Sequence, residues 1–438
     1  MAAVAAAPRE RQRALDLSLG AAGVGLVAVG VFGGATALAL LGVLLVATMV
    51  LILAPELMVC ALVVAGSVKA APWFPELPVD LTLVAWAGTI LAMLVRGLRP
   101  GIGIPPFPRA MALALPLVAI VVASAFWSLD REGGAAKALQ FELVTMTAFV
   151  APVVLIRSRA ALVRLAYAFC GYGLLIALTT VETENLGEPL AAAGGNQIQA
   201  ALYPAIAVVF ICTYLALLAR GVSRLAVLAP LAILLPATFA AGSRGVFIGA
   251  VVVSGYIAGR AVLVSARRGR VLLAVGLATV GAVVLWPYLA GGAEDRYQQQ
   301  LLSTNLERVV GERENLYRRG VYLAADNPIV GVGAGGFAYS SIVYERAEYP
   351  HNILLEFASE EGLAAAALFA ALVIAAWRAR LRSGLGANGP EVLLSGALLL
   401  LFLSEAMVSF DINGNRGMWF ALGLAFALRG LRPDAVER

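Results

Sequence analysis

The chain is built from long apolar runs that are separated by short polar tracts. In lipid every backbone N–H and C=O needs a partner within the chain, so an apolar run of about 20 residues predicts a membrane-spanning helix. The first three runs are short, so either twelve or fourteen crossings are expected, and both numbers keep the two termini on one side. The runs lie near residues 17–33, 35–54, 56–71, 79–96, 110–127, 137–156, 161–181, 198–219, 224–240, 246–265, 271–290, 352–377, 392–410 and 416–430.

Composition supports the same class, since 61% of the residues are hydrophobic and only 13% are charged. These values exclude an ordinary soluble domain. We therefore expect an all-α polytopic integral membrane protein with 12–14 transmembrane helices and one long extracytoplasmic loop. Its expected parts are an N-terminal transmembrane bundle over 1–290, a loop with interfacial helix over 291–350, and C-terminal transmembrane helices over 351–438.

Basic residues alternate between the tracts that join the apolar runs. With a cytoplasmic N-terminus, the inner tracts hold 21 of the 32 basic residues, as the positive-inside rule requires. The net charge of +5 is then a topology signal and needs no nucleic-acid partner. This orientation places loop 291–350, Arg244, Arg416 and the single histidine, His351, at the outer face.

The long outer loop contains two recognisable segments. Residues 305–325 carry apolar side chains at helical spacing among charges, which predicts an amphipathic interfacial helix that ends at Asn327 and Pro328. The glycine-rich stretch from Gly331 to Gly336 follows no strand, so we expect a tight turn there and not a nucleotide-binding loop.

Arg244 is the first candidate functional residue at the outer face. It lies in the sequence Ala-Gly-Ser-Arg-Gly of residues 241–245, between two spans. A guanidinium at the membrane interface binds an anion such as a diphosphate in a bidentate manner. The alternative is that Arg244 only extends toward lipid headgroups.

His351 is the second candidate, because it precedes the helix expected from Asn352. The positive end of a helix disfavours imidazolium and keeps the ring neutral, as a base near neutral pH requires. A purely structural histidine is the alternative. No metal site is expected from histidine, since no second one exists, although Glu182 and Glu184 could hold a divalent ion or simply be solvated.

The positions of the cysteines do not indicate a functional site. The three cysteines, Cys60, Cys170 and Cys212, all fall within apolar runs, which favours a role in packing. We expect neither a disulfide framework nor a thiolate nucleophile.

Several motifs together resemble the O-antigen ligase and O-antigen polymerase superfamily. They are Ser243-Arg244-Gly245, the run Arg313 to Tyr317 followed by Asn327 to Gly333, and His351 to Glu356 with Glu361-Gly362. The resemblance covers roughly residues 190–430. It implies a membrane glycosyltransferase that moves a glycan from a polyprenyl diphosphate carrier to an acceptor sugar, without nucleotide sugar and, for the ligases, without metal. By motif position, it implies that Arg244 holds the diphosphate and His351 assists the acceptor hydroxyl.

The chain departs from the family pattern before the Ser-Arg-Gly element. Gln197 stands where the family has an asparagine, and no arginine occurs between Arg164 and Arg220. A second phosphate-binding cation must come from elsewhere, and our candidates are Arg416 first and Arg313 second. The expected substrate-binding residues are therefore Arg416, Arg313, Gln197 and Asn352.

These inferences predict an inverting, metal-independent transfer with no bound cofactor. Cations would stabilise the diphosphate leaving group while a base accepts the proton of the incoming hydroxyl. The expected partners are a polyprenyl-diphosphate-linked glycan, a glycan or glycolipid acceptor and membrane lipid, at the outer face of a bacterial cytoplasmic membrane.

A transporter or flippase of lipid-linked glycans is the alternative function. Such a protein would need ionisable residues near the bilayer midplane, for which Glu142 and Glu405 are the candidates. A non-catalytic scaffold for polysaccharide assembly is a third possibility.

Overall fold

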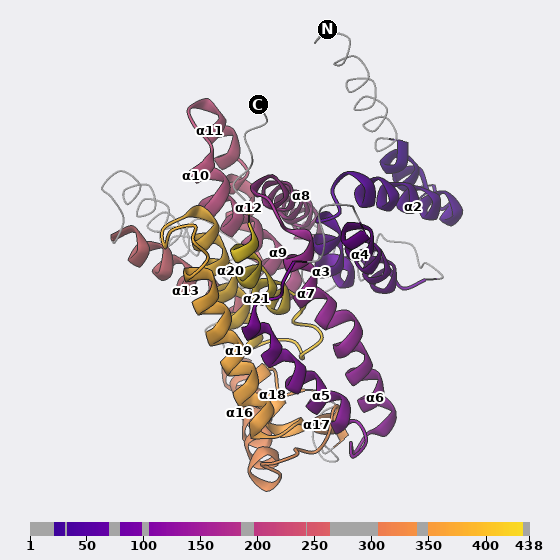
Figure 1. Ribbon diagram of the computed structural model, residues 1–438, viewed down its shortest axis with the longest axis vertical. Coiled ribbons are helices and arrows are strands. Elements are labelled where there is room, and N and C mark those ends of the chain that lie inside the picture. Colours follow the sequence, from indigo (N-terminus) through magenta and orange to yellow (C-terminus); the bar gives the residue numbers. More distant parts are fainter. Residues whose placement is uncertain are drawn as a thin grey trace.

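A computed structural model describes residues 22–30, 33–69, 79–98, 105–184, 197–241, 243–262, 305–339 and 349–431. Within these ranges the chain forms helices and no β-strand, which confirms the all-α class (Figure 1). The helices are α2 (Thr36–Leu53), α3 (Leu57–Lys69), α4 (Leu81–Leu98), η1 (Arg109–Leu113), α5 (Ala114–Ser124), α6 (Arg131–Gln140), η2 (Phe141–Thr145), α7 (Met146–Leu155), α8 (Arg159–Glu184), α9 (Gln197–Phe210), η3 (Ile211–Leu215), α10 (Ala216–Leu218), α11 (Val222–Leu228), α12 (Leu231–Ala240), α13 (Arg244–Val262), α16 (Asn305–Asp326), α17 (Gly336–Tyr339), α18 (Ile353–Glu360), α19 (Leu363–Leu381), α20 (Pro390–Ala406), α21 (Arg416–Ala427) and η4 (Leu428–Gly430).

Six helical stretches of the described chain are long and apolar enough to cross a membrane. They are Leu81–Leu98, Arg131–Leu155, Arg159–Thr179, Ile198–Leu218, Val222–Phe239 and Leu363–Leu381. Four shorter apolar helices, Leu41–Leu53, Leu57–Val68, Arg109–Ser124 and Gly245–Arg260, accompany them. The run expected near 271–290 lies outside the described residues, as do residues 17–21, 31 and 32 of the first run. The multi-pass class is thus confirmed, and the number of twelve or fourteen crossings stays a prediction.

The span expected over 352–377 is wrong as a single helix. The helix is interrupted at Glu361 and Gly362, where Gly362 has a φ of 90°. The break exists because the glycine-rich loop pairs with the end of α18: Val332 N–H donates to Ser359 O at 2.9 Å and Gly333 N–H donates to Glu360 O at 2.8 Å. A Cβ at position 362 would lie 2.3 Å from the carbonyl oxygen of Ile329, so only glycine fits this close approach.

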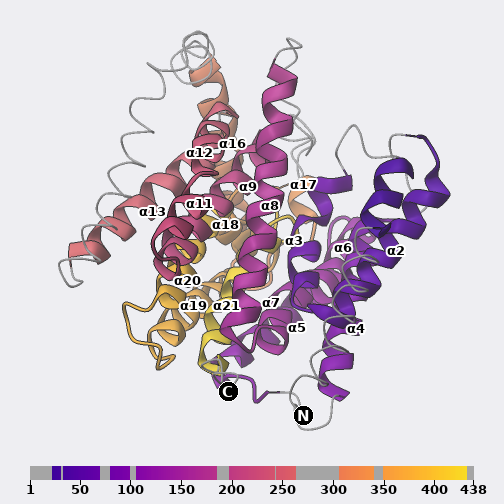
Figure 2. The same ribbon diagram turned by 90° about the horizontal axis from the view of Figure 1, so that it is seen from above.

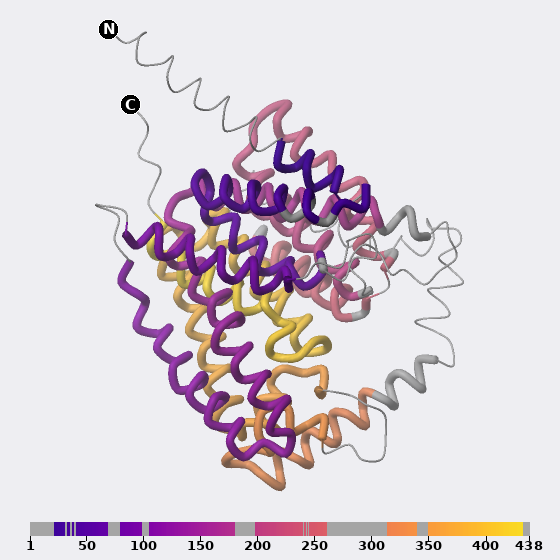
Figure 3. Tube along the Cα trace, turned by 90° about the vertical axis from the view of Figure 1, so that its right-hand side faces the viewer, coloured from indigo at the N-terminus to yellow at the C-terminus, as the bar shows by residue number. Residues whose placement is uncertain are grey.

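The segment expected to be the long loop has the two features that its sequence predicted. Residues Asn305–Asp326 form α16, which ends where Asn327 and Pro328 follow. The stretch from Gly331 to Gly336 is a turn with positive φ at alternate glycines, 331, 333 and 335. Gly320 on α16 packs against Leu355 on α18, and both helices lie at one end of the molecule (Figures 1 and 3).

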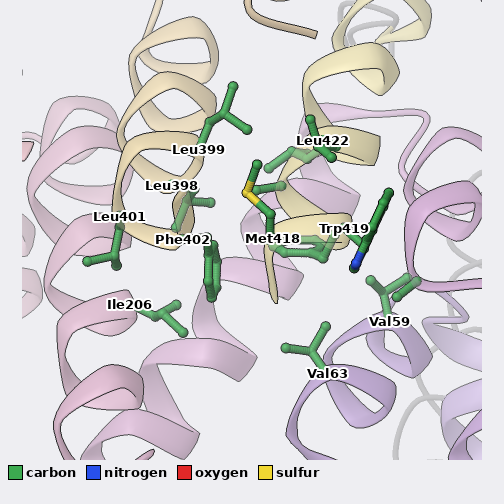
Figure 4. Close-up of a cluster of buried hydrophobic side chains, with 14 of the residues drawn as sticks. Val59, Val63, Ile206, Leu398, Leu399, Leu401, Phe402, Met418, Trp419 and Leu422 are labelled. Atoms are coloured by element: carbon green, nitrogen blue, oxygen red, sulfur yellow. The ribbon is translucent and has the colours of Figure 1, made fainter. Parts of the chain in front are cut away.

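The interior is centred on α21, whose residues from Gly417 to Ala427 are all buried. Trp419 packs edge-on against Phe141 at a centroid distance of 5.2 Å, and Met418 and Phe402 fill the adjacent space (Figure 4). In contrast, α2 and α4 lie at the periphery, and α13 lies at the opposite side (Figure 2). Large apolar side chains exposed on peripheral helices, such as Leu94 and Leu115, suit contact with lipid.

Lys137 on α6 is the hub of a buried ionic cluster. Its Nζ lies 2.6 Å from Glu356 Oε1 and 2.6 Å from Glu360 Oε2, and both glutamates are fully buried on α18. Ile412 N–H donates to Glu356 Oε1 at 3.2 Å, and Gly335 N–H donates to Glu360 Oε2 at 2.9 Å. The cluster therefore fixes α18 to α6 and to two loops.

The arrangement of the helix ends allows a test of membrane orientation. The turn between α10 and α11 lies at the end of the molecule opposite to α16 and α17 (Figure 1). We predict that Glu132→Cys and Ile329→Cys react with an impermeant thiol reagent in intact cells, whereas Ser223→Cys does not. All three positions are exposed, and the parent cysteines Cys60 and Cys212 are buried. Labelling at Ser223→Cys alone would reverse the orientation.

Candidate functional site

The carbonyl oxygen of Met407 joins three segments that are distant in sequence. Tyr317 Oη on α16 donates to it at 3.4 Å, and Asn352 Nδ2 donates to it at 3.2 Å. Met407 itself follows α20, so the end of α20, the middle of α16 and the start of α18 meet at this point (Figure 3). We call the residues around this carbonyl the Met407 corner: Arg313, Tyr317, His351, Asn352 and Glu405 to Val408.

Asn352 has a structural role at this corner. Its Oδ1 accepts from Leu355 N–H at 3.0 Å and caps the first turn of α18, while its Nδ2 donates to the Met407 carbonyl oxygen. The side chain expected to contact substrate thus already makes two bonds that hold the preceding residue, His351, in place.

His351 is half-buried and adopts a φ of 55°, a left-handed conformation that costs a non-glycine residue free energy. Its ring lies edge-on to Tyr349 at a centroid distance of 4.6 Å, and its Nδ1 is buried without a hydrogen-bond partner among the described residues. Burial, and then the positive charge of Arg313, lower the pKa of His351 below its ordinary value. The lowered pKa favours the neutral ring near pH 7, which can accept a proton, and its causes are burial and Arg313.

Arg313 lies one helical turn before Tyr317 on the half-buried face of α16. Its positive charge acts on both His351 and Glu405, which places its guanidinium near both side chains. No carboxylate of the described chain comes within ion-pair distance of it. Arg313 can therefore offer its N–H groups to an anionic ligand.

Arg244 begins α13, as expected for a residue between two spans. Its neighbour Gly245 packs directly against Glu405: a Cβ at position 245 would lie 2.6 Å from Glu405 Oε2 and 2.6 Å from Val408 Cγ2. The backbone at Arg244 is thus brought to the same corner as Arg313 and His351. The orientation of the Arg244 side chain lies outside what the structure describes.

Glu405 is a member of the corner that the sequence suggested only as a transporter residue. It is 1% exposed near the end of α20, with the buried Ser409 beside it. The sequence feature that could have identified Glu405 as a site residue is a carboxylate near the end of an otherwise apolar run. By contrast, Glu142 is exposed and lines a separate groove of about 670 Å³ between η1, α5 and α7.

Arg416 lies elsewhere. Its Nη1 donates to Leu62 O on α3 at 3.3 Å, and its guanidinium packs over Gly66. The charged and polar groups that act on it are Tyr203, Asp411 and Asp80, whereas Arg313 is the one that acts on His351. Of the two candidates for a second cation, the structure therefore brings Arg313 to His351 and places Arg416 against α3.

For the other candidate residues from the sequence, the structure describes the backbone but not the side chains. Gln197 begins α9, and Glu182 and Glu184 lie at the end of α8, but their side chains are not among the described ones. Within the described part of the chain, no three His, Cys, Asp or Glu side chains are grouped as metal ligands.

Comparison with known proteins agrees with the motifs. Residues 229–370 match the family described as O-antigen ligase, and no curated protein matches the chain. The matched segment contains Arg244, Arg313 and His351 and ends before Glu405 and Arg416. The match confirms the resemblance to the O-antigen ligase and polymerase superfamily and supports glycan transfer of that general kind in a multi-pass membrane protein.

His351 offers a direct test of the electrostatics, because it is the only histidine in the chain. In protein labelled with ¹⁵N-histidine, the single imidazole should titrate with a midpoint below about 6.5, the ordinary value. Arg313→Gln removes a positive charge that disfavours imidazolium, so the midpoint should rise. Arg318→Gln is the matched control, since Arg318 is exposed and pairs with Glu314 at 2.6 Å. An unchanged midpoint in Arg313→Gln would show that the two side chains do not interact.

Proposed function

We propose that the chain is a membrane glycosyltransferase that moves a glycan from a polyprenyl diphosphate carrier to an acceptor sugar on the outer face of a bacterial cytoplasmic membrane. The observation that carries this proposal is the meeting of Arg313, His351 and the start of α13 at the Met407 corner. The family match over residues 229–370 supports the same class of reaction.

Direct displacement at the anomeric carbon accounts for these residue types. The acceptor hydroxyl oxygen forms a bond to that carbon as the bond to the diphosphate oxygen breaks, and the anomeric configuration inverts. Neutral His351 accepts the proton of the hydroxyl, and the guanidinium groups of Arg244 and Arg313 stabilise the charge that develops on the leaving diphosphate. The leaving group is already good, so this scheme uses no carboxylate nucleophile and no metal.

Arg416 retains its expected substrate-binding role in this proposal, in a second region of the site away from His351. Arg416 lies beside Asp411, whose loop also carries Ile412, the residue that bonds to Glu356 on α18. Arg416 and Gln197 would then contact parts of the lipid-linked glycan beyond the diphosphate, while Arg313 supplies the second cation at the diphosphate.

A flippase of lipid-linked glycans is the second candidate. It would use ionisable groups within the bilayer as steps along a path. The position of His351, Arg313 and Glu405 at one corner, with Glu142 on a separate apolar groove, favours a fixed reaction site over such a path.

Arg244 gives the first test, with purified protein, a polyprenyl-diphosphate-linked oligosaccharide and an acceptor glycan. Arg244→Lys keeps the charge but loses bidentate geometry, so the transfer rate should fall about 10- to 100-fold, or roughly 1.5 to 3 kcal/mol. Arg244→Ala should be slower still, at unchanged protein abundance. A ladder of products would indicate a polymerase and a single transfer a ligase. Full activity in Arg244→Ala would show that Arg244 only contacts lipid headgroups and does not bind the diphosphate.

His351 gives the second test. A positioned base contributes about 100- to 10,000-fold to a rate, so His351→Ala should nearly abolish transfer at saturating donor. Donor affinity, measured by direct binding, should stay close to that of the parent protein, because the arginines make the diphosphate contact. If affinity collapses while residual turnover is normal, His351 binds the donor; if neither changes, its role is structural.

A further inference from the structure

Glu405 poses a problem for the proposed reaction. It places a buried carboxyl group at the corner where a diphosphate would bind, and two negative charges that lie close together repel each other. A carboxylate at this position needs a physical reason, because burying an ionisable group in an apolar helix costs free energy.

The contacts of Glu405 give that reason. Its Oε2 lies against Gly245, next to Arg244, and the carboxylate also feels the positive charge of Arg313. Two residues farther along, the Met407 carbonyl is bonded by Tyr317 from α16 and by Asn352 beside His351. Glu405 is thus the ionisable group that lies against the start of α13 and within electrostatic range of the arginine of α16.

The distance between Glu405 and Arg313 is also informative. The two side chains interact electrostatically, yet they do not form an ion pair within 4.0 Å in the described chain. An arginine that were needed only to neutralise a buried glutamate would close this gap, as Lys137 does with Glu356 and Glu360. The separation leaves the guanidinium able to receive another anion.

We propose that Glu405 is a positioning residue that holds Arg313 of α16 and the start of α13 in place in the absence of donor, and that its negative charge weakens the binding of the diphosphate product. The inference rests on the proposed function and names one more residue of the same site. Because the diphosphate gains negative charge when the glycan leaves, repulsion from Glu405 acts more strongly on the product than on the donor.

Neutral substitutions make the inference testable. Glu405→Gln keeps the shape of the side chain, and it should bind polyprenyl diphosphate about 3- to 30-fold more tightly than the parent protein, because one repulsive charge is gone. KM for the donor and kcat should fall together, since a tightly held product leaves slowly. A side chain with only a packing role would not tighten binding.

Three further variants keep the result interpretable. Glu405→Met, an apolar side chain of similar length that suits an apolar helix, should also tighten binding, so the test survives if the glutamine variant does not fold. Glu405→Asp keeps the charge and should stay within about threefold of the parent affinity. Glu391→Gln removes a buried carboxylate at the far end of α20, where it pairs with Arg159 at 2.8 Å, and should leave the affinity unchanged.

The outcomes separate this inference from the function on which it rests. If the parent protein binds no polyprenyl diphosphate, both are overturned. If the parent binds it and Arg244→Ala does not, but the folded neutral variants of Glu405 bind with unchanged or weaker affinity, only the role of Glu405 is wrong. Tightening by Glu405→Gln and Glu405→Met but not by Glu391→Gln supports it.

Discussion

Pairing of the buried amino group of Lys137 with Glu356 and Glu360 is the interaction on which the end of the molecule that carries α16, α17 and α18 depends. A lone ammonium or carboxylate among apolar helices is strongly unfavourable, so the three groups have to stay together. The same carboxylates accept N–H groups from Ile412 and Gly335, and one short helix is therefore tied to α6, to the glycine-rich loop and to the loop before α21. Since α18 begins directly after His351 and Asn352, this cluster fixes where the histidine lies.

Backbone geometry at the corner is consistent with a site whose parts are held by their surroundings. His351 and Phe410 are the two non-glycine residues of the described chain with positive φ. His351 precedes Asn352, which donates to the Met407 carbonyl, and Phe410 follows Met407 by three residues. Such conformations persist only where neighbouring contacts determine them, and they are frequent at functional sites. Here the cap made by Asn352 and its bond to Met407 supply those contacts.

The apolar core and the charged Met407 corner are separated because charged groups are unfavourable among apolar membrane helices. The apolar helices around Trp419 pack tightly and provide a rigid base, and the indole N–H of Trp419 donates to Ile412 O. Charged groups appear where helices end and loops meet, because there the backbone N–H and C=O groups released by the helix ends can pair with them. Arg313, His351, Glu405 and the start of α13 all lie at such ends or on the interfacial helix α16, apart from the apolar groove that Glu142 lines.

The sequence alone determined the all-α membrane class, the helix over 305–325 with its end at Asn327 and the start of a helix at Arg244. It also suggested the residue types of the proposed site. These features depend on local apolar periodicity, on proline and asparagine as helix breakers and on short motifs, all of which are readable along the chain. The break at Gly362, the choice of Arg313 over Arg416 beside His351 and the presence of Glu405 at the corner were decided by the tertiary structure. Each of these depends on contacts between segments that are far apart in sequence, such as Val332 with Ser359 or Tyr317 with Met407, and no periodicity of a single segment encodes them.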